Sequence, residues 1–202
     1  FGELNQGILN SYLMEITEQI CKKKDDLSDA YLIDRILDKA GQKGTGKWTC
    51  QEGIEMGIPI PTIVEAVSSR NISSDYENRK ILSKKYESGK SEGRVREEKE
   101  ELIRRIEGAA YIANICIYNQ AFALIEHAKG IFGWEMDLSE VTQIWRNGCI
   151  IRATLLDDLN RAVLENGSNL LMNETFCAYI RQHRSELNQV LKDAISCQIS
   201  VP

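Results

Sequence analysis

The 202-residue sequence predicts an all-α fold, a multi-helix domain built around one long central helix. Apolar residues recur with the period of a helix, about 3.6 residues, along almost the whole chain, and alternating patterns typical of strands are scarce. Only three prolines occur, so few positions interrupt a helix. The longest pattern runs from 98 to about 131, and its middle, AAYIANICIYNQAFALI, is apolar nearly all round, which is typical of a helix at a domain's centre.

Two helices are expected in the first forty residues. Leu9 opens an apolar stripe that continues with helical spacing and fades into the charged run at 22–26. Ser28 is placed to cap a second helix, and Gly41 is placed to end it. The apolar positions between them share one helical face, so this helix is expected to pack against the domain.

A helical hairpin is expected next. One helix should run over about 45–56 and close at Gly57, and Pro61 suits the first turn of another that continues to about 71. The stretch 74–104 is crowded with mixed charges, which is typical of a solvated helix and loop. It contains the sequence GKSEGR, where a break is expected.

The long pattern at 98–131 would give a helix of about 50 Å, in which Gly108 and Gly130 are the weak points. A helix ending at Trp145 should follow, with the next pattern as its continuation or successor. After the turn ENGSN, two amphipathic helices are expected, and they cover roughly 173–183 and 185–198.

Composition narrows the function classes. The formal net charge of −5 does not favour a nucleic-acid partner, and no apolar run approaches the ~20 residues of a membrane span. Six scattered cysteines without metal-ligand spacing are typical of free thiols in a reducing compartment, so we expect a cytoplasmic location. The chain begins at Phe1 and ends at Pro202 beside an amphipathic pattern, so both ends look cut from something longer, and residues 1–202 are read as a single domain.

AGQKGTGKWT, at 40–49, resembles the P-loop G-x-x-x-x-G-K, but Trp48 replaces the hydroxyl residue that binds magnesium. The preceding segment is periodic as a helix, and no strand is available to support a P-loop. Nucleotide binding is therefore rejected. The glycines, the two lysines and the expected helix start still favour an anion. The alternative is that the glycines are turn residues and Thr45 only caps its own helix.

Arg70 ends an apolar stripe of the helix that starts at Pro61, so it needs a partner. That partner is either a carboxylate, such as Glu52 or Glu65, or a bound anion, and the sequence leaves both open.

Four other chemistry-bearing side chains are interpreted as structural. His127 and His183 lie in helical stretches without a neighbouring constellation of metal ligands, so we expect packing or surface roles and no metal site. Arg146 and Arg152 are six residues apart and do not share a helix face. Salt bridges are expected for both.

Several motifs resemble one family across the whole chain. LDKAGQKGTGKWT is similar to the signature of 6-phosphogluconate dehydrogenase. FGELNQGILNSYLMEIT is similar to that family's F-x-x-W-N-x-G-x-L-x-S-Y/F-L-x-E-I-T, with Leu4 in place of tryptophan. IFGWEMDLSEVTQIWRNGCIIRA is similar to its F-G-W…I-W-R-G-G-C-I-I-R-S, with Asn147 and Ala153 as departures.

The resemblance implies oxidative decarboxylation of 6-phosphogluconate to ribulose 5-phosphate with reduction of NADP, a step of the pentose phosphate pathway. It implies that this chain is the helical substrate-binding and dimerisation domain of a homodimer. The family's Rossmann domain, general base and general acid would precede Phe1, and its C-terminal tail would follow Pro202. The chain is then expected to hold no catalytic residue and no cofactor, and to be inactive alone.

The family's substrate-binding lysine and threonine match Lys43 and Thr45, and its phosphate-binding arginine matches Arg70. Two other classes stay open, a non-catalytic helical interaction module and a related hydroxyacid dehydrogenase. The preference for NADP over NAD is not encoded in these residues.

Overall fold

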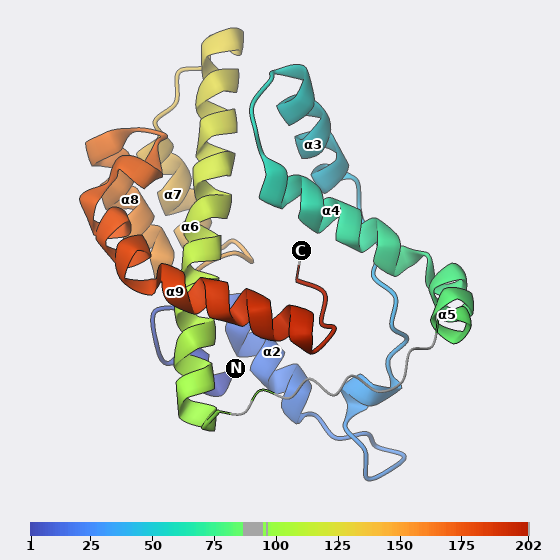
Figure 1. Cartoon of the computed structure of the whole chain (residues 1–202). Helices are drawn as coiled ribbons and strands as arrows, with labels where there is room; N and C mark the ends of the chain where they lie inside the picture. The colour runs from blue at the N-terminus through green and yellow to red at the C-terminus, as the bar shows by residue number, and fades with distance from the viewer. Residues whose placement is uncertain (87–94, 96, 202) are drawn as a thin grey trace.

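The computed structural model describes residues 1–86, 95 and 97–201, and this part of the chain is helical, as predicted (Figure 1). The expected break at 89–94 lies outside the described residues. Two isolated backbone bridges are the only strand-like pairings in the described part. The α-helices are α1 (Gly2–Asn5), α2 (Tyr12–Lys22), α3 (Thr45–Glu55), α4 (Pro61–Ser74), α5 (Tyr76–Lys85), α6 (Lys99–Phe132), α7 (Leu138–Arg146), α8 (Leu155–Asn166) and α9 (Glu174–Ser196), with short 3-10 turns at Leu32–Arg35 and Leu170–Met172.

The central helix is confirmed. α6 contains 34 residues and continues through both Gly108 and Gly130. In Figure 1, α9 crosses α6, with α7 and α8 on one side of α6 and the α3–α4 hairpin on the other. Gly108 lies close to α9 at the crossing, and a Cβ there would displace the carboxylate of Glu186 on α9.

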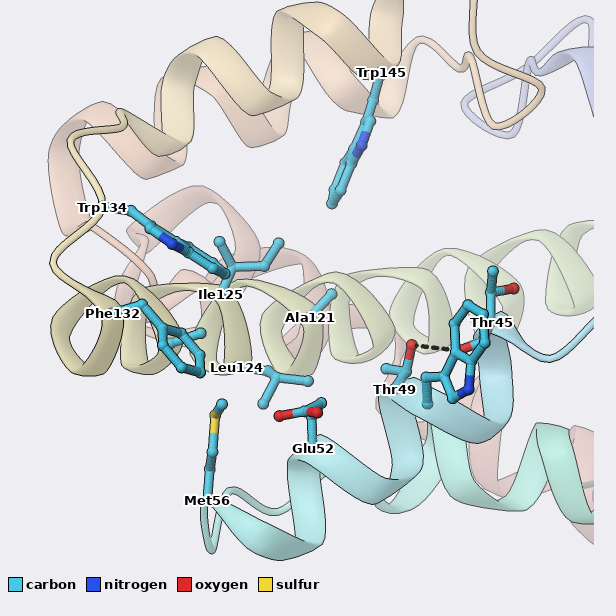
Figure 2. A pocket seen from close by; sticks show the side chains of 12 residues that line it. Thr45, Thr49, Glu52, Met56, Ala121, Leu124, Ile125, Phe132, Trp134 and Trp145 are labelled. Carbon is cyan, nitrogen blue, oxygen red and sulfur yellow. Dashed lines mark hydrogen bonds between the residues drawn. The ribbon is translucent and has the colours of Figure 1, made fainter.

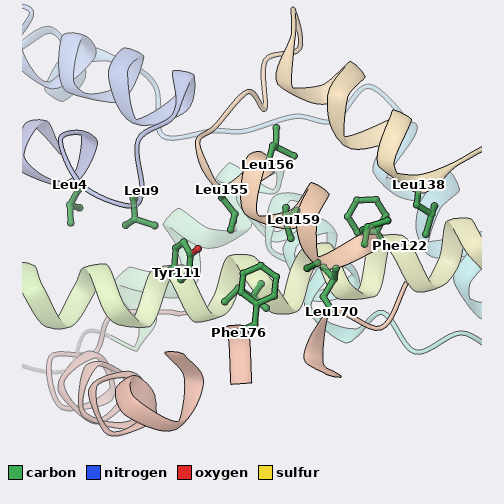
Figure 3. Close-up of a cluster of buried hydrophobic side chains, with 13 residues drawn as sticks. Leu4, Leu9, Tyr111, Phe122, Leu138, Leu155, Leu156, Leu159, Leu170 and Phe176 are labelled. Carbon is green, nitrogen blue, oxygen red and sulfur yellow. The ribbon is translucent and has the colours of Figure 1, made fainter. Parts of the chain in front are cut away.

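The hydrophobic core lies where α6 meets α8 and α9 (Figure 3). Aromatic and leucine side chains from α6, α8 and α9 fill it, and the 3-10 turn at Leu170–Met172 closes it. Burial of these side chains from water is the main force that holds the helices together. The side chains with almost no exposed surface are Phe122, Phe176, Ile115, Leu156, Leu159 and Leu170.

Two glycines allow α3 and α4 to pack closely. A Cβ on Gly53 would collide with Ile60, and a Cβ on Gly46 would collide with Val67. The pair therefore forms a tight hairpin with the start of α3 beside the C-terminal half of α4. Gln120 of α6 attaches this hairpin, because its side chain accepts from the Thr62 amide at 3.0 Å and donates to the Thr62 hydroxyl at 2.8 Å.

The helix expected between Ser28 and Gly41 is wrong. The chain there makes a turn closed by a backbone bridge between Lys24 and Tyr31, then the 3-10 turn at Leu32–Arg35 and an extended segment. Most of its large apolar side chains are not covered by the described residues, and Leu37 is 58% exposed. A short helix without a buried face is not stable in water, so periodicity alone did not determine the structure.

Two other boundaries differ from those expected, and a third decides between two alternatives that the sequence left open. The last segment is one helix, Glu174–Ser196, instead of two, and it packs against α6. α8 is a successor of α7 and not its continuation, and Gly148, with φ of 99°, lies in the turn between them. Leu9 is buried, but it lies before the first helical turn of α2, which the Ser11 hydroxyl caps.

The length of α6 bears on the expectation that no apolar run approaches a membrane span. By length and composition alone, α6 could cross a membrane, and it is the one helix in the described part of which this is true. A core helix of a helical domain passes the same test. α6 packs against α9, α4 and the 3-10 turn at Leu170–Met172, which is the packing of a core helix.

Candidate anion site

The glycine-rich loop leads directly into α3. The helix begins at Thr45, as predicted, and Gly44 takes the N-cap position with φ of 105°. This left-handed conformation favours glycine. The first amides of a helix have no partner within it, so those of α3 remain available to an anion beside the loop.

Thr45 does not cap its own helix, because Gly44 occupies that position and no side-chain cap forms. The Thr45 hydroxyl makes no hydrogen bond to any described residue, and its carbonyl accepts from Thr49. The structural alternative for Thr45 is therefore not supported. The exposed hydroxyl is free to bind a ligand at the start of α3.

Arg70 pairs with neither carboxylate that the sequence offered. Its Nε donates to the Gly41 carbonyl at 3.0 Å, and its Nη2 donates to the same oxygen. No carboxylate in the described part lies within ion-pair distance of Arg70. One edge of the guanidinium thus holds the loop backbone, while Nη1 and the second Nη2 hydrogen have no partner among the described residues.

The structure brings Arg70 and the loop together at one end of the α3–α4 hairpin. Lys43 and Lys47 are exposed, and neither makes an ion pair with a described residue. Lys43 lies two residues from Gly41, to which Arg70 is bonded. The result is a cationic, glycine-rich loop whose charges are not neutralised by neighbouring carboxylates.

An apolar groove that sequence reasoning did not identify begins next to Thr45 (Figure 2). It has a volume of about 660 Å³ and lies between α3 and the second half of α6. Trp48, Trp134 and Trp145 line it, so it does not suit a sugar phosphate. The spacing of Trp48 and Met56 on one face of α3 is the sequence signal that could have indicated it.

The other candidate residues have structural roles, as predicted. Arg146 pairs with Asp157 at 3.1 Å, and Arg152 pairs with Glu15 at 3.8 Å and also lies over the Tyr12 ring at 4.4 Å. His183 stacks on Tyr179 with ring centroids 4.2 Å apart.

The other titratable groups of note differ in burial. His183 Nδ1 lies 2.6 Å from Glu186, and His127 is exposed on α6. Burial raises the pKa of Tyr118 to about 12 and that of Tyr179 to about 12. No group of three potential metal ligands occurs within the described part.

The fold and this site together define an all-helical domain with an unneutralised cationic loop at its surface. The family model of the 6-phosphogluconate dehydrogenase C-terminal domain matches residues 1–202. The chain belongs to the 6-phosphogluconate dehydrogenase family.

Individual relatives agree. The NADP(+)-dependent and NAD(+)-dependent decarboxylating 6-phosphogluconate dehydrogenases of Bacillus subtilis are 40% and 38% identical over the whole chain, which covers 43% of each. The Plasmodium falciparum 6-phosphogluconate dehydrogenase, solved in its apo form and with NADP+ and 6-phosphogluconate, superposes with a TM-score of 0.93 at 37% identity, covering all of this chain and 44% of that one. The chain thus spans about two fifths of the length of these relatives.

Proposed function

We propose that the chain is the helical substrate-binding and dimerisation domain of a 6-phosphogluconate dehydrogenase. The parent enzyme would oxidise and decarboxylate 6-phosphogluconate to ribulose 5-phosphate and carbon dioxide while reducing NADP. One observation carries the proposal. Arg70 is hydrogen-bonded to the loop that carries Lys43 and leads into Thr45, and no carboxylate among the described residues pairs with it.

The three residues suit the phosphate end of the substrate. A phosphate monoester carries about two negative charges at neutral pH and offers three acceptor oxygens. The unoccupied edge of the Arg70 guanidinium would donate two parallel hydrogen bonds to the phosphate, and Lys43 would supply a mobile positive charge. The Thr45 hydroxyl would donate a further hydrogen bond. The first amides of α3 add to the same positive potential. None of these groups is assigned a role in proton or hydride transfer.

The coenzyme is proposed to be NADP, bound by a separate dinucleotide-binding domain such as the family possesses. Residues 1–202 hold no G-x-G-x-x-G sequence of the kind that binds a dinucleotide. The two Bacillus subtilis relatives use different coenzymes, NADP and NAD, and are almost equally similar to this chain. Similarity within this domain therefore does not determine the coenzyme.

A homodimer in the cytoplasm is the proposed state. Only 33% of the most apolar 18-residue window of α6 is buried within the chain, which leaves apolar surface for a second copy. The six cysteines form no disulfide, which is typical of a reducing compartment.

A titration monitored by amide chemical shifts tests the substrate assignment. 6-Phosphogluconate and inorganic phosphate should both shift the amide signals of residues 41–47, whereas gluconate, which lacks the phosphate, should not. Shifts of equal size with gluconate would contradict a phosphate subsite and favour another hydroxyacid. No localised shift with any of the three ligands would favour a non-catalytic helical module.

A further inference from the structure

Side chains of α4 and α5 anchor the loop before α3 at successive points. The Ala40 amide donates to Ser73 Oγ at 3.1 Å, and Gln42 Nε2 donates to Asn71 Oδ1 at 2.6 Å. In the described part, no backbone–backbone hydrogen bond joins residues 38–43 to α4 or α5. The shape of this loop therefore depends on side-chain contacts.

Arg79 on α5 makes the most extensive of these contacts. Its Nη1 lies 3.0 Å from Asp38 Oδ2, and its Nη2 donates to the Asp38 carbonyl and, at 3.2 Å, to the Ser73 carbonyl. One guanidinium thus joins the start of the loop to the last turn of α4. Its Nε is buried without a hydrogen-bond partner among the described residues, so the two Nη groups make all of these contacts.

We infer that Arg79 is a positioning residue for the anion site: it holds the loop at Asp38 and Ser73 so that Lys43 and the Arg70-bound Gly41 carbonyl keep their places. This inference rests on the proposed function, because it assigns a role to Arg79 in phosphate binding. Arg79 acts through the loop, since three of its N–H groups are already used by Asp38 and Ser73.

The guanidinium is suited to this role in a way that an ammonium is not. Its planar fork reaches a carboxylate and two carbonyls that belong to different segments, whereas a lysine would supply one compact charge. The Asp38–Arg79 ion pair itself is exposed on the Asp38 side, which is 80% exposed, so it adds little stability. The contribution of Arg79 is to loop geometry and not to the fold as a whole.

Arg79→Met tests the inference, with Lys80→Met as the matched control. Lys80 is the next residue on α5, is exposed, and makes no described contact with the loop. Lys80→Met therefore removes one positive charge, as Arg79→Met does, but leaves every loop anchor in place. Two quantities are measured in each variant: the affinity for 6-phosphogluconate by amide chemical-shift titration, and hydrogen exchange of the amides at 38–43 without ligand.

We expect Arg79→Met to weaken binding about tenfold, the scale of one charge-assisted hydrogen bond, and to speed exchange at 38–43. Lys80→Met should change neither by more than about twofold. Ser73→Ala, which removes one loop anchor and no charge, should also speed exchange at 38–43. It replaces Arg79→Met as the test variant if Arg79→Met does not fold.

Four outcomes overturn the inference. They are unchanged exchange at 38–43 in the anchor variants, unchanged affinity in Arg79→Met, equal weakening by Lys80→Met, and weakening that accompanies a general rise in exchange throughout α3 and α4. The two proposals fail separately. If the unmodified chain does not bind 6-phosphogluconate, the proposed function fails, and the exchange measurement still decides whether Arg79 anchors the loop. If the chain binds and Arg79→Met binds equally well, only the role of Arg79 fails.

Discussion

Gly46 of α3 lies directly against Val67 of α4, where a Cβ on Gly46 would come within 2.8 Å of Val67 Cγ2. Real Cβ atoms do not approach that closely, so the contact exists only because residue 46 is glycine. Gly46 follows Thr45 in the chain, and Val67 is three residues before Arg70. The contact therefore fixes the distance between the two sides of the anion site.

Gly46→Ala should separate the two sides. The added methyl forces α3 away from Val67, and we expect a loss of about 1–3 kcal/mol in unfolding free energy, as in other overpacked contacts, with weaker binding of 6-phosphogluconate. Denaturant unfolding and the shift titration measure these effects. Gly46→Ala combined with Val67→Ala should recover most of both, because the second change removes the clashing methyl. Failure of the double variant to recover binding would show that Gly46 is needed for another reason.

Arg70→Lys should weaken binding of the phosphorylated substrate by about 1–3 kcal/mol, because lysine keeps the charge but loses the fork. In an active enzyme that contains this chain, the effect should appear mainly in KM, since the phosphate is remote from the reacting carbon. Lys43→Met should also reduce affinity. Kinetics with 6-phosphogluconate measure both variants.

Gluconate is the control for Arg70→Lys. Whatever weak activity gluconate supports should scarcely change, because it lacks the group that Arg70 binds. Equal loss on both substrates, or a matching fall in Tm, would instead make Arg70 a structural residue whose task is to hold the Gly41 carbonyl.

The purified 202-residue chain should be catalytically silent. It contains no dinucleotide-binding fingerprint, and loss of one general acid or base alone typically costs about 10²–10⁴ in rate. Absorbance at the reduced-nicotinamide wavelength in the presence of 6-phosphogluconate and NADP measures this. Detectable reduction by the chain alone would contradict it.

The chain should associate with itself through apolar surface that includes α6. Light scattering over a range of concentrations should show a dimer. A monomer at every concentration would count against the proposal that this domain carries the dimer interface.

The sequence predicted most of the helices, because these depend on local patterns, whereas the roles of Lys43, Thr45 and Arg70 rest on the family resemblance and stay a prediction. Periodicity located α6 and α4, and glycines with lysines located the loop before Thr45. It could not identify the partner of Arg70, since a backbone carbonyl such as that of Gly41 has no sequence signature. It misplaced a helix at 28–41 because periodicity shows an apolar face but not whether anything covers that face. Leu37, for example, belongs to this apolar face and is exposed.

The contacts that shape the anion site are local along the chain, and this has a consequence for the order of folding. The loop and its anchors fall within residues 38–79, so the largest separation among these hydrogen bonds is 41 residues. The α6–α9 pairing, by contrast, includes Arg104 and Glu186, which are 82 residues apart. Short closures cost less chain entropy and form sooner. The α3–α4 hairpin with its loop is therefore expected to gain protection before α9 docks, and pulsed hydrogen exchange during refolding would show late protection in residues 38–73 if the order were reversed.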